Sequence, residues 1–369
     1  MNDKKLGILS MQEVLNYGSF LQAFGLKRIF EENGFDVSFV KVKKGRQLPG
    51  YEFERSVFKS AGRLFEHVKN GNIISWFKGR HFQKKWHQAF FDSYFKILEI
   101  EKKEHEMYDL VVIGSDEVFN CVQRIEWGFS TQFFGNIPNA KNIVSYAASF
   151  GHTTLCDILS INLQDELKKY LSSLKEISVR DQNSFDIIKQ LLGYEAPINI
   201  DPVLLYDYSS YLRKRDDLKD YIIIYSYPYR IPQSESVYIR ALAKKYDKKL
   251  ISIGCYYTWC NESIIPQTPF EVLEYFNNAD FIITDTFHGS IFSMKGHKNF
   301  CTIVRDSNKQ KVRFLLDSLS MHDVIIENLR DLEQRYLRTI DYTNYDLVVS
   351  EKKREAMDYL KRVMNYADR

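Results

Sequence analysis

The chain has 369 residues, of which 44% are hydrophobic and 15% aromatic, so it is long enough for two domains with sizeable cores. Its 51 Lys and Arg against 48 acids give a formal charge of +3, which argues against a nucleic-acid-binding protein. The five cysteines lack the spacing of a disulfide framework or zinc site, and no apolar segment suits a signal peptide or membrane span. We therefore expect a soluble cytoplasmic protein of bacterial type.

The first part of the chain has the alternation of strands and helices that is typical of a parallel sheet. Residues 6–10 are a short apolar run, residues 16–33 have helical spacing, and residues 37–42 resemble a second strand. Residues 51–106 break this alternation, and we predict that they form a helical insertion rich in aromatic residues. Further predicted elements are strands at 110–113, 142–151 and 176–180 and helices at 163–173 and 184–192.

A second α/β series follows an Asp-Pro pair at residues 201–202. The predicted elements are strands at 221–227, 249–254, 281–285 and 299–304 and helices at 235–246, 269–277 and after His288. We therefore divide the chain into a first domain (1–204), a second domain (205–345) and a C-terminal helix (346–369). Two doubly wound domains bind ligands in the cleft between them, at the carboxyl ends of their strands.

Basic and aromatic residues alternate in the insertion. Residues 58–86 contain seven Lys or Arg and one acid, interleaved with Trp76, Phe77, Phe82 and Trp86. Such a helix can lie on an anionic lipid surface, which predicts a peripheral contact with the inner membrane surface. The alternative is an aromatic face packed on the domain with the lysines pointing outward.

Polar residues follow the first and third predicted strands. Asn16, Tyr17 and Gly18 precede a helix, where free N–H groups attract anions and sugar hydroxyls, although Asn16 alternatively only caps that helix. After residues 110–113, Ser115 and Asp116 follow a glycine, and the Asp is suited to orient a sugar or, alternatively, to cap a turn. The chain has no GxGxxG pattern here, so we do not infer NAD.

Basic residues lie near two other strand ends. The guanidinium of Arg180 is suited to donate two hydrogen bonds to a phosphate or a carboxylate. The alternative is a salt bridge with Asp181 or Asp201. Beyond the strand at 299–304 a basic cluster follows, which either binds an anion or belongs to a solvated loop; its members are Arg305, Lys309, Lys311 and Arg313.

The stretch ITDTFHGS brings an acid and a histidine to a strand-to-helix corner. Asp285 ends the strand and His288 follows three residues later, beside Gly289. Histidine titrates near neutral pH and is suited to general acid or base work. The alternative for a lone histidine is a structural hydrogen bond.

Six stretches together resemble the polysaccharide pyruvyl transferase family and occur in the order found there. They span about residues 6–320 and read NYGSFLQAFGLKRIFEENGFDV, YDLVVIGSDEVFN, VSYAASFG, EISVRDQNSFDIIKQLLG, NIDPVLL and ADFIITDTFHGSIFSMKGHKNFCTI. The resemblance implies a glycosyltransferase B-like α/β fold, in which two Rossmann-like, doubly wound domains face a cleft.

The resemblance also implies an activity. Pyruvate would pass from phosphoenolpyruvate onto two hydroxyls of a sugar, forming a cyclic ketal and releasing phosphate. The acceptor would be a hexose or hexosamine of a capsule or exopolysaccharide precursor, typically lipid-linked, at the inner face of the plasma membrane. Phosphoenolpyruvate is then a co-substrate, and the reaction requires no cofactor and no metal.

This activity suggests roles for the residues at the strand ends. His288 would be the acid/base, with Asp285 and Asp116 as further catalytic candidates. Arg180, with Arg305 or Arg313, would clamp the anionic groups of the donor. Other predicted substrate-binding residues are Asn16, Tyr17, Gly18, Ser115, Thr286, Gly289 and Ser290. Asn16 and Asp116 would face the acceptor.

Two motifs depart from the family's pattern. Thr286 stands where some relatives have the Arg of Arg-Leu-His-Gly, so other basic residues must replace that Arg or the anion must sit differently. Glu117 and Phe119 differ from the Gln and Trp of GSDQVWN. Two alternatives stay open: a glycosyltransferase with a nucleotide-sugar donor, and a non-catalytic sugar-binding or assembly protein of polysaccharide biosynthesis.

Overall fold

Two parallel β-sheets organise the chain, of which the computed structural model describes residues 4–53 and 73–368. The first sheet has the strand order β2-β1-β3-β4, and each neighbouring pair is parallel. Its strands are β1 (Lys4–Leu9), β2 (Phe35–Phe39), β3 (Tyr108–Asp116) and β4 (Ala140–Ala148). Their side chains are mostly buried, as expected for a parallel sheet covered on both faces.

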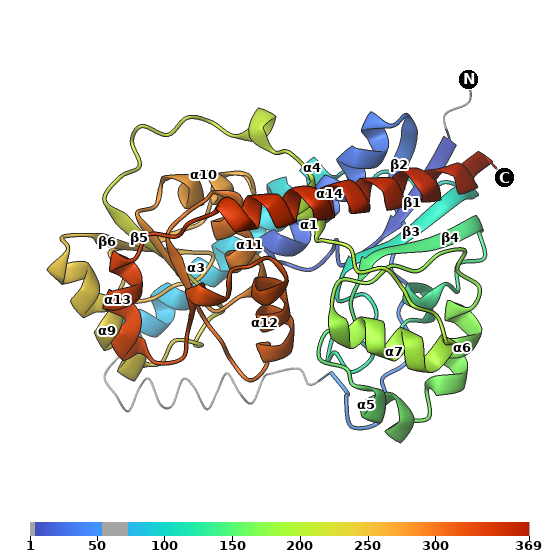
Figure 1. Cartoon of the computed structure of the whole chain (residues 1–369), viewed down its shortest axis with the longest axis horizontal. Coiled ribbons are helices and arrows are strands. Elements are labelled where there is room, and N and C mark those ends of the chain that lie inside the picture. Colours follow the sequence, from blue (N-terminus) through green and yellow to red (C-terminus); the bar gives the residue numbers. More distant parts are fainter. Residues whose placement is uncertain (1–3, 54–72, 369) are drawn as a thin grey trace.

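The second sheet has the order β10-β9-β8-β5-β6-β7 and is parallel throughout. Its strands are β5 (Tyr221–Tyr225), β6 (Lys249–Ile253), β7 (Glu262–Ile264), β8 (Phe281–Thr284), β9 (Phe300–Ile303) and β10 (Ile325–Ile326). Figure 1 shows the two sheets in opposite halves of the molecule. This arrangement confirms the predicted fold class, two Rossmann-like domains that face a cleft.

Helices connect the strands and cover the sheets. Those of the first half are α1 (Tyr17–Glu32), α5 (Leu155–Ser160), α6 (Gln164–Leu171), α7 (Gln182–Leu192) and α8 (Pro202–Leu205). Those of the second half are α9 (Gln233–Lys245), α10 (Glu271–Asn278), α11 (Phe287–Lys295), α12 (Lys309–Ser318) and α13 (Leu332–Leu337). The predicted helices lie within a few residues of α1, α6, α7, α9, α10 and α11, whereas α5, α8, α12 and α13 were not predicted.

The segment predicted as a strand that ends at Arg180 is not a continuous strand, which corrects that prediction. Val179 makes single parallel bridges with Ala148 on one side and with Ile198 on the other. The segment thus extends the edge of the first sheet without a regular ladder. Arg180 still lies at the carboxyl end of this sheet, because it directly follows the bridged residue.

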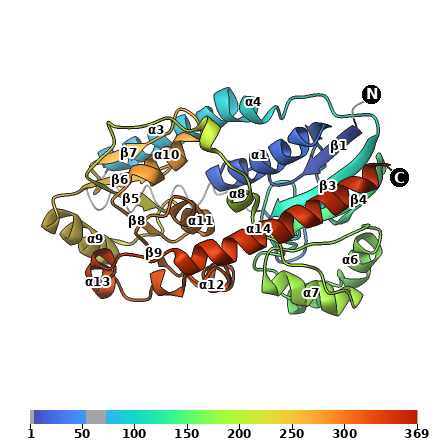
Figure 2. The ribbon, with the colours of Figure 1, turned by 45° about the horizontal axis from the view of Figure 1, so that its top comes forward.

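The insertion lies between β2 and β3 in sequence but packs against the second half of the molecule. Its described elements are α3 (Ile73–Ala89), a π-helix (Phe90–Tyr94) and α4 (Phe95–Leu98), while residues 54–72 lie outside the described residues. Figures 1 and 2 both place α3 among the elements of the second sheet. The Phe82 ring lies 6.0 Å from that of Tyr256, and the Tyr94 hydroxyl donates to the Pro266 carbonyl. The insertion therefore ties the two halves together.

The C-terminal helix crosses from one half to the other. α14 (Thr343–Met364) begins beside the second sheet and ends beside the first (Figures 1 and 2). The Tyr359 hydroxyl donates to the Ser145 carbonyl at 2.7 Å. The domain boundaries at 204 and 345 stay predictions; the first lies within α8, between the last bridge of the first sheet and the start of β5.

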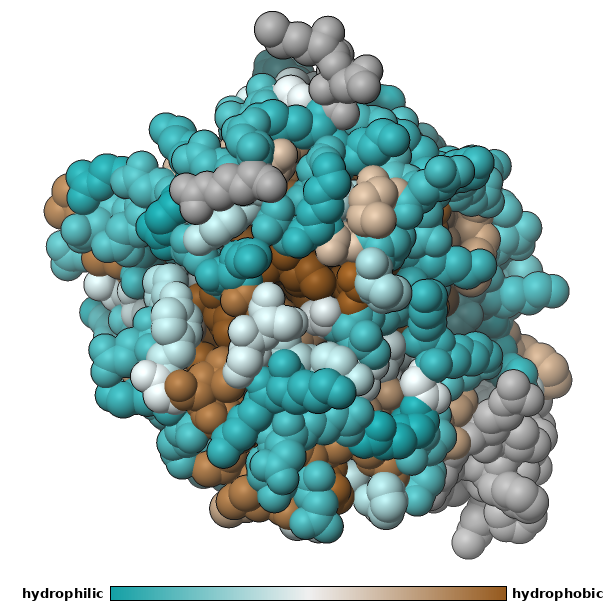
Figure 3. Space-filling model, turned by 90° about the vertical axis from the view of Figure 1, so that its right-hand side faces the viewer, coloured by the Kyte–Doolittle hydropathy of each residue, from teal (hydrophilic) through white to brown (hydrophobic). Residues whose placement is uncertain are grey.

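Polar side chains cover the end of the molecule that carries the first sheet. Seen from that end, hydrophobic side chains show mainly in recesses between hydrophilic ones (Figure 3). Over the stretches that the structure describes, no helix is both long enough and apolar enough to cross a membrane.

Candidate active site

A cavity of about 550 Å³ lies between the two halves, at the carboxyl ends of strands from both sheets. Segments that follow β1, β3 and β4 form one wall, and segments that follow β5, β8 and β9 form the other. Open α/β sheets bind ligands at this edge, because the loops that leave the strands diverge there. The cavity is therefore the first place to look for the site.

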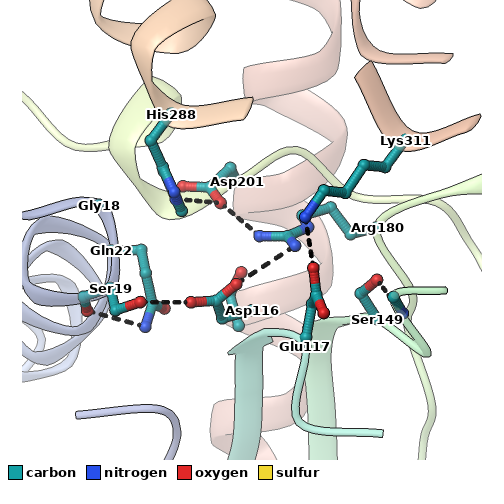
Figure 4. Close-up of polar contacts among 12 residues, drawn as sticks. Gly18, Ser19, Gln22, Asp116, Glu117, Ser149, Arg180, Asp201, His288 and Lys311 are labelled. Carbon is teal, nitrogen blue, oxygen red and sulfur yellow. Dashed lines mark hydrogen bonds and ion pairs between the residues drawn. The ribbon is translucent and has the colours of Figure 1, made fainter. Parts of the chain in front are cut away.

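A buried arginine joins two carboxylates at the floor of this cavity. Arg180 donates from Nη1 to Asp201 Oδ2 at 2.9 Å and from Nη2 to Asp116 Oδ1 at 3.3 Å (Figure 4). Asp116 also accepts from Ser19 Oγ at 2.7 Å, and the Arg180 guanidinium lies 4.4 Å from the centre of the Phe287 ring. The predicted salt bridge to Asp201 is thus present, and Arg180 lines the cavity as a paired cation.

His288 completes this cluster from the second half of the molecule. It lies in the first turn of α11, and its Nε2 is 3.4 Å from Asp201 Oδ2 (Figure 4). This buried Nε2 makes no hydrogen bond to the described residues. The ring packs on Gly18, where a Cβ atom would lie 2.1 Å from His288 Cγ. Gly18 therefore leaves room for the imidazole, and any side chain there would displace it.

The two carboxylates of the cluster are held in their ionised form. Burial by itself raises the pKa of Asp116, but the charges of Arg180 and His288 outweigh it and bring the pKa below the ordinary value. Burial also raises the pKa of Asp201, and the nearby His288 and the charge of Arg180 again lower it further than burial raises it. With a proton on His288, the cluster holds two positive and two negative charges.

An ion pair spans the cavity from one half to the other. Lys311 on α12 donates to Glu117, which follows β3 (Figure 4). Burial disfavours the charge on both groups, yet the pair keeps the pKa of Glu117 lowered and that of Lys311 raised. Both side chains line the cavity. Glu117, which differs from the Gln of the family's motif, therefore links the first half of the molecule to the second through this ion pair.

The start of α12 adds positive charge to the wall of the second half. Residues 306–311 line the cavity, and the side chain of the N-cap residue Asn308 makes no capping hydrogen bond to the helix. The Asn308 side chain instead donates to the Asp285 carbonyl at 2.7 Å. Arg230 lies beside this turn, donates to Ser307 Oγ at 2.7 Å and lines the cavity too. Uncapped helix N–H groups and neighbouring cations favour a bound anion.

Several predicted site residues therefore come together around the cavity. Asn16, Asp116, Arg180 and His288 all line it. Asn16 caps α1, because its Oδ1 accepts from the Gly18 N–H at 2.7 Å. Its Nδ2 also donates to the Tyr227 hydroxyl at 3.2 Å. The capping role is thus present, and the ligand-binding role of Asn16 stays a prediction.

Asp285 and Arg305 lie behind the cavity wall instead of in it. Arg305 donates to both oxygens of Glu235 at 2.6 Å and to Asp285 at 3.2 Å, so its charge is already paired. Burial raises the pKa of Asp285 despite Arg230 and Arg305, in contrast to Asp116. Both residues contact Asn308, and they therefore support the turn that precedes α12.

The remaining predicted residues also lie outside the wall of this cavity. Arg313 pairs with Glu327, and Thr286 caps α11 by accepting from the Gly289 N–H at 2.9 Å. Ser290 contacts Thr302 at 2.9 Å within the second half. Tyr17 is buried and accepts from the Trp86 indole, while the Ser115 hydroxyl is buried without a partner among the described residues.

Sequence reasoning did not assign three residues to the site that the structure brings together there: Arg230, Glu117 and Lys311. Arg230 follows β5 in a turn with no recognisable motif, and Glu117 and Lys311 lie far apart in sequence. Lys311 belongs to the predicted basic cluster, whose spacing alone did not distinguish it from Arg305 and Arg313. A helix predicted to begin at Lys309 would have placed Lys311 in its first turn. Arg313, two residues later, would then lie on the opposite face of the same helix from Lys311.

The comparisons with solved structures agree with this fold. A putative UDP-N-acetylglucosamine 2-epimerase from Listeria monocytogenes has a TM-score of 0.52 and 10% identity, with 99% of this chain and 97% of that chain covered. A glycosyltransferase from Streptomyces nogalater has a TM-score of 0.43 and 10% identity, over 99% and 100% of the two chains. At 10% identity the likeness to the epimerase concerns the fold alone, and a TM-score below 0.5 supports no argument from the glycosyltransferase. No curated protein sequence matches the chain.

The family comparison identifies the chain more directly. The family model described as polysaccharide pyruvyl transferase matches residues 16–307, which is well over half of the chain. The matched region begins at the cap of α1 and ends in the turn before α12, so it includes Asn16, Asp116, Arg180 and His288. The chain belongs to the polysaccharide pyruvyl transferase family.

Proposed function

We propose that this enzyme transfers pyruvate from phosphoenolpyruvate to two hydroxyls of a sugar unit in a polysaccharide precursor, forming a cyclic ketal. The observation that carries the proposal is the cavity itself. It places the His288–Asp201–Arg180–Asp116 cluster opposite the cationic start of α12. An anionic donor and an acid/base group thus meet in one space.

The second wall provides the groups that suit the donor. Phosphoenolpyruvate carries a phosphate and a carboxylate, and both favour cations and free N–H groups. Arg230, Lys309 and the first turn of α12 face this space, whereas Arg305 and Arg313 are engaged by Glu235 and Glu327. We therefore replace the clamp predicted from sequence by Arg230 and Lys309, with Arg180 contributing from the floor.

His288 is the group that moves protons in this proposal. One sugar hydroxyl oxygen bonds to C2 of phosphoenolpyruvate while C3 takes a proton from the imidazolium. The second hydroxyl then bonds to C2, and phosphate leaves with the bonding electron pair. The imidazole accepts the proton of the first hydroxyl, and the proton of the second hydroxyl leaves on the phosphate, so His288 ends the cycle protonated as it began. Asp201 lies 3.4 Å from Nε2 of this imidazole.

The lipid-linked nature of the acceptor and a peripheral place at the membrane are part of the proposal. α3 exposes Phe77, whose side chain is 60% accessible, among exposed Lys78, Arg80, Lys84 and Lys85. This basic and aromatic surface suits an anionic membrane. The inner sides of the same helix, including Phe82, pack on the protein, as the alternative predicted.

One experiment tests the proposal against its alternatives. The protein is incubated with phosphoenolpyruvate and with synthetic or lipid-linked hexosides, and phosphate release is followed. A product heavier by one pyruvate less one water, found by mass spectrometry, is expected. Tight binding of a uridine or guanosine nucleotide without such a product would favour a glycosyltransferase. No phosphate release with any acceptor would favour a non-catalytic protein.

A further inference from the structure

A second, smaller cavity of about 70 Å³ opens on the other side of His288. It shares Asn16, Tyr227 and His288 with the main cavity, so the two spaces meet at the imidazole. Its other wall comes from the insertion, through Gln83 and Trp86 of α3. A group bound in either cavity therefore reaches the same histidine.

The two cavities differ in charge. The main cavity is lined by Arg, Lys, Asp and Glu side chains, whereas the described residues that line the smaller one include none of these four types. The smaller cavity has aromatic walls, Tyr17, Trp86, Tyr225 and Tyr227, and uncharged hydrogen-bonding groups such as Gln83. Such a lining suits a neutral ligand that has both an apolar face and hydroxyls. It does not suit a phosphate.

We infer that the smaller cavity binds a sugar ring of the acceptor, with Trp86 as the surface on which the ring packs. The inference rests on the proposed function and assigns the two substrates to the two sides of His288. Gln83 lines this cavity, where its amide can hydrogen-bond a sugar hydroxyl. Ser226 and Thr286 offer further hydroxyl groups in the same lining.

Trp86 is held in a fixed relation to the imidazole. Its indole N–H donates to the Tyr17 hydroxyl at 2.9 Å, and its ring lies 5.1 Å from that of Phe90. Tyr17 directly precedes Gly18, on which the His288 ring packs. The helical insertion thus provides Trp86 as a specificity-determining residue. Trp86 is linked to His288 through Tyr17 and the neighbouring Gly18.

The test compares two tryptophans of the same helix. Trp86→Ala is expected to raise the KM for the acceptor hexoside by about tenfold, as for loss of an aromatic contact, and to change the KM for phosphoenolpyruvate by less than about twofold. Trp86→Phe should restore most of the acceptor affinity, because it keeps a ring. Trp76→Ala is the matched control, since Trp76 packs under Arg80 and lines neither cavity.

A binding measurement separates this inference from the proposed function. Saturation-transfer NMR with methyl glucoside, methyl galactoside and methyl N-acetylglucosaminide should show binding of at least one by the wild type without phosphoenolpyruvate. Gln83→Trp, which fills the cavity and spares Trp86, should abolish that signal in a folded protein. Sugar binding without pyruvyl transfer would support the cavity and refute the function.

Other outcomes overturn the inference. They are the absence of binding by every one of these hexosides, a signal that persists in both Trp86→Ala and Gln83→Trp, or equal acceptor KM values for Trp86→Ala and Trp76→Ala. A Trp86→Ala enzyme that loses affinity for phosphoenolpyruvate instead of the hexoside would also overturn it. Circular dichroism confirms that each variant is folded.

Discussion

The corners after β3 and β8 look alike in sequence but differ in what they present to the cavity. Each begins with a buried strand that ends near an aspartate, Asp116 in one and Asp285 in the other. Asp116 lines the cavity, and neighbouring positive charges lower its pKa below the ordinary value. Asp285 lies behind the wall, where burial raises its pKa.

The difference shows that a strand end does not by itself decide which side chain meets a ligand. After β8 the helix α11 begins almost at once, and His288 in its first turn is the residue that lines the cavity. Asp285 instead pairs with Arg305 behind the wall. After β3 the chain continues without a helix, and Asp116 itself stays in front. The same residue type therefore lines the cavity at one corner and supports its wall at the other.

The largest expected effect concerns the histidine of the second corner. His288→Ala should lower kcat for ketal formation by about 10³-fold, because it removes the proposed proton carrier. His297→Ala is the control, since His297 forms an exposed ion pair with Asp346. Phosphate release under saturating phosphoenolpyruvate measures the effect. A His288→Ala enzyme with full activity would refute the assigned role.

The two aspartates provide the direct test of the comparison. Asp116→Asn should lower kcat by about 10²-fold, because the charge balance of the cluster is lost in the cavity. Asp285→Asn should leave kcat within about fivefold, because Asp285 lies behind the wall of the cavity, and it should leave the protein folded, because the fold already favours the uncharged form of this side chain. Steady-state kinetics and urea unfolding of both variants decide the matter; equal losses of kcat would abolish the distinction.

The cations of the second wall give a smaller effect. Arg230→Ala should raise the KM for phosphoenolpyruvate by about tenfold with little change in kcat, as for the loss of a charged hydrogen bond to the donor. Arg313→Ala should leave both constants near those of the wild type, because Arg313 pairs with Glu327 away from the cavity. A raised KM for phosphoenolpyruvate in Arg313→Ala, with no change in Arg230→Ala, would instead support the donor-binding role predicted for Arg313 from the sequence.

The smallest effect is a difference in the pH dependence of stability. The lowered pKa of Asp116 contributes stability above the ordinary carboxyl pKa of about 4, which is lost as the pH falls through the folded-state value. The raised pKa of Asp285 has the opposite sign, because stability is regained as the pH falls through it toward the ordinary value.

Between neutral and acid pH, Asp116→Asn should therefore lose less stability than the wild type, and Asp285→Asn should lose more. Urea unfolding at a series of pH values measures both slopes. Slopes that shift in the same direction would show that the two corners are electrostatically alike.

Much of the fold was predictable because buried parallel strands are continuous apolar runs. Segments such as Tyr221–Tyr225 and Phe281–Thr284 are recognisable for this reason. The segment before Arg180 was not, since it pairs only through isolated bridges. Neither was the place of α3, because its aromatic residues show that it packs but not on which half of the molecule.

The candidate site was predictable in part. Strand-end position located Asn16, Asp116, Arg180 and His288, all of which line the cavity. It could not separate Arg305 from Arg230. Both lie near Asp285, but Arg305 is held by both oxygens of Glu235 at 2.6 Å, whereas Arg230 lies 3.9 Å from Asp285 Oδ1 and lines the cavity. That pairing is set by Glu235, which lies on α9 far from both corners in sequence.

The contact between Gly18 and His288 has a consequence for the proposed chemistry. The glycine belongs to the first half of the molecule and the histidine to the second, so the imidazole is seated only while the halves are closed. A side chain at position 18 would push the imidazole away from Asp201, and the proposed proton transfer would be lost with it. The proposed acid/base group is thus positioned by a residue that has no side chain.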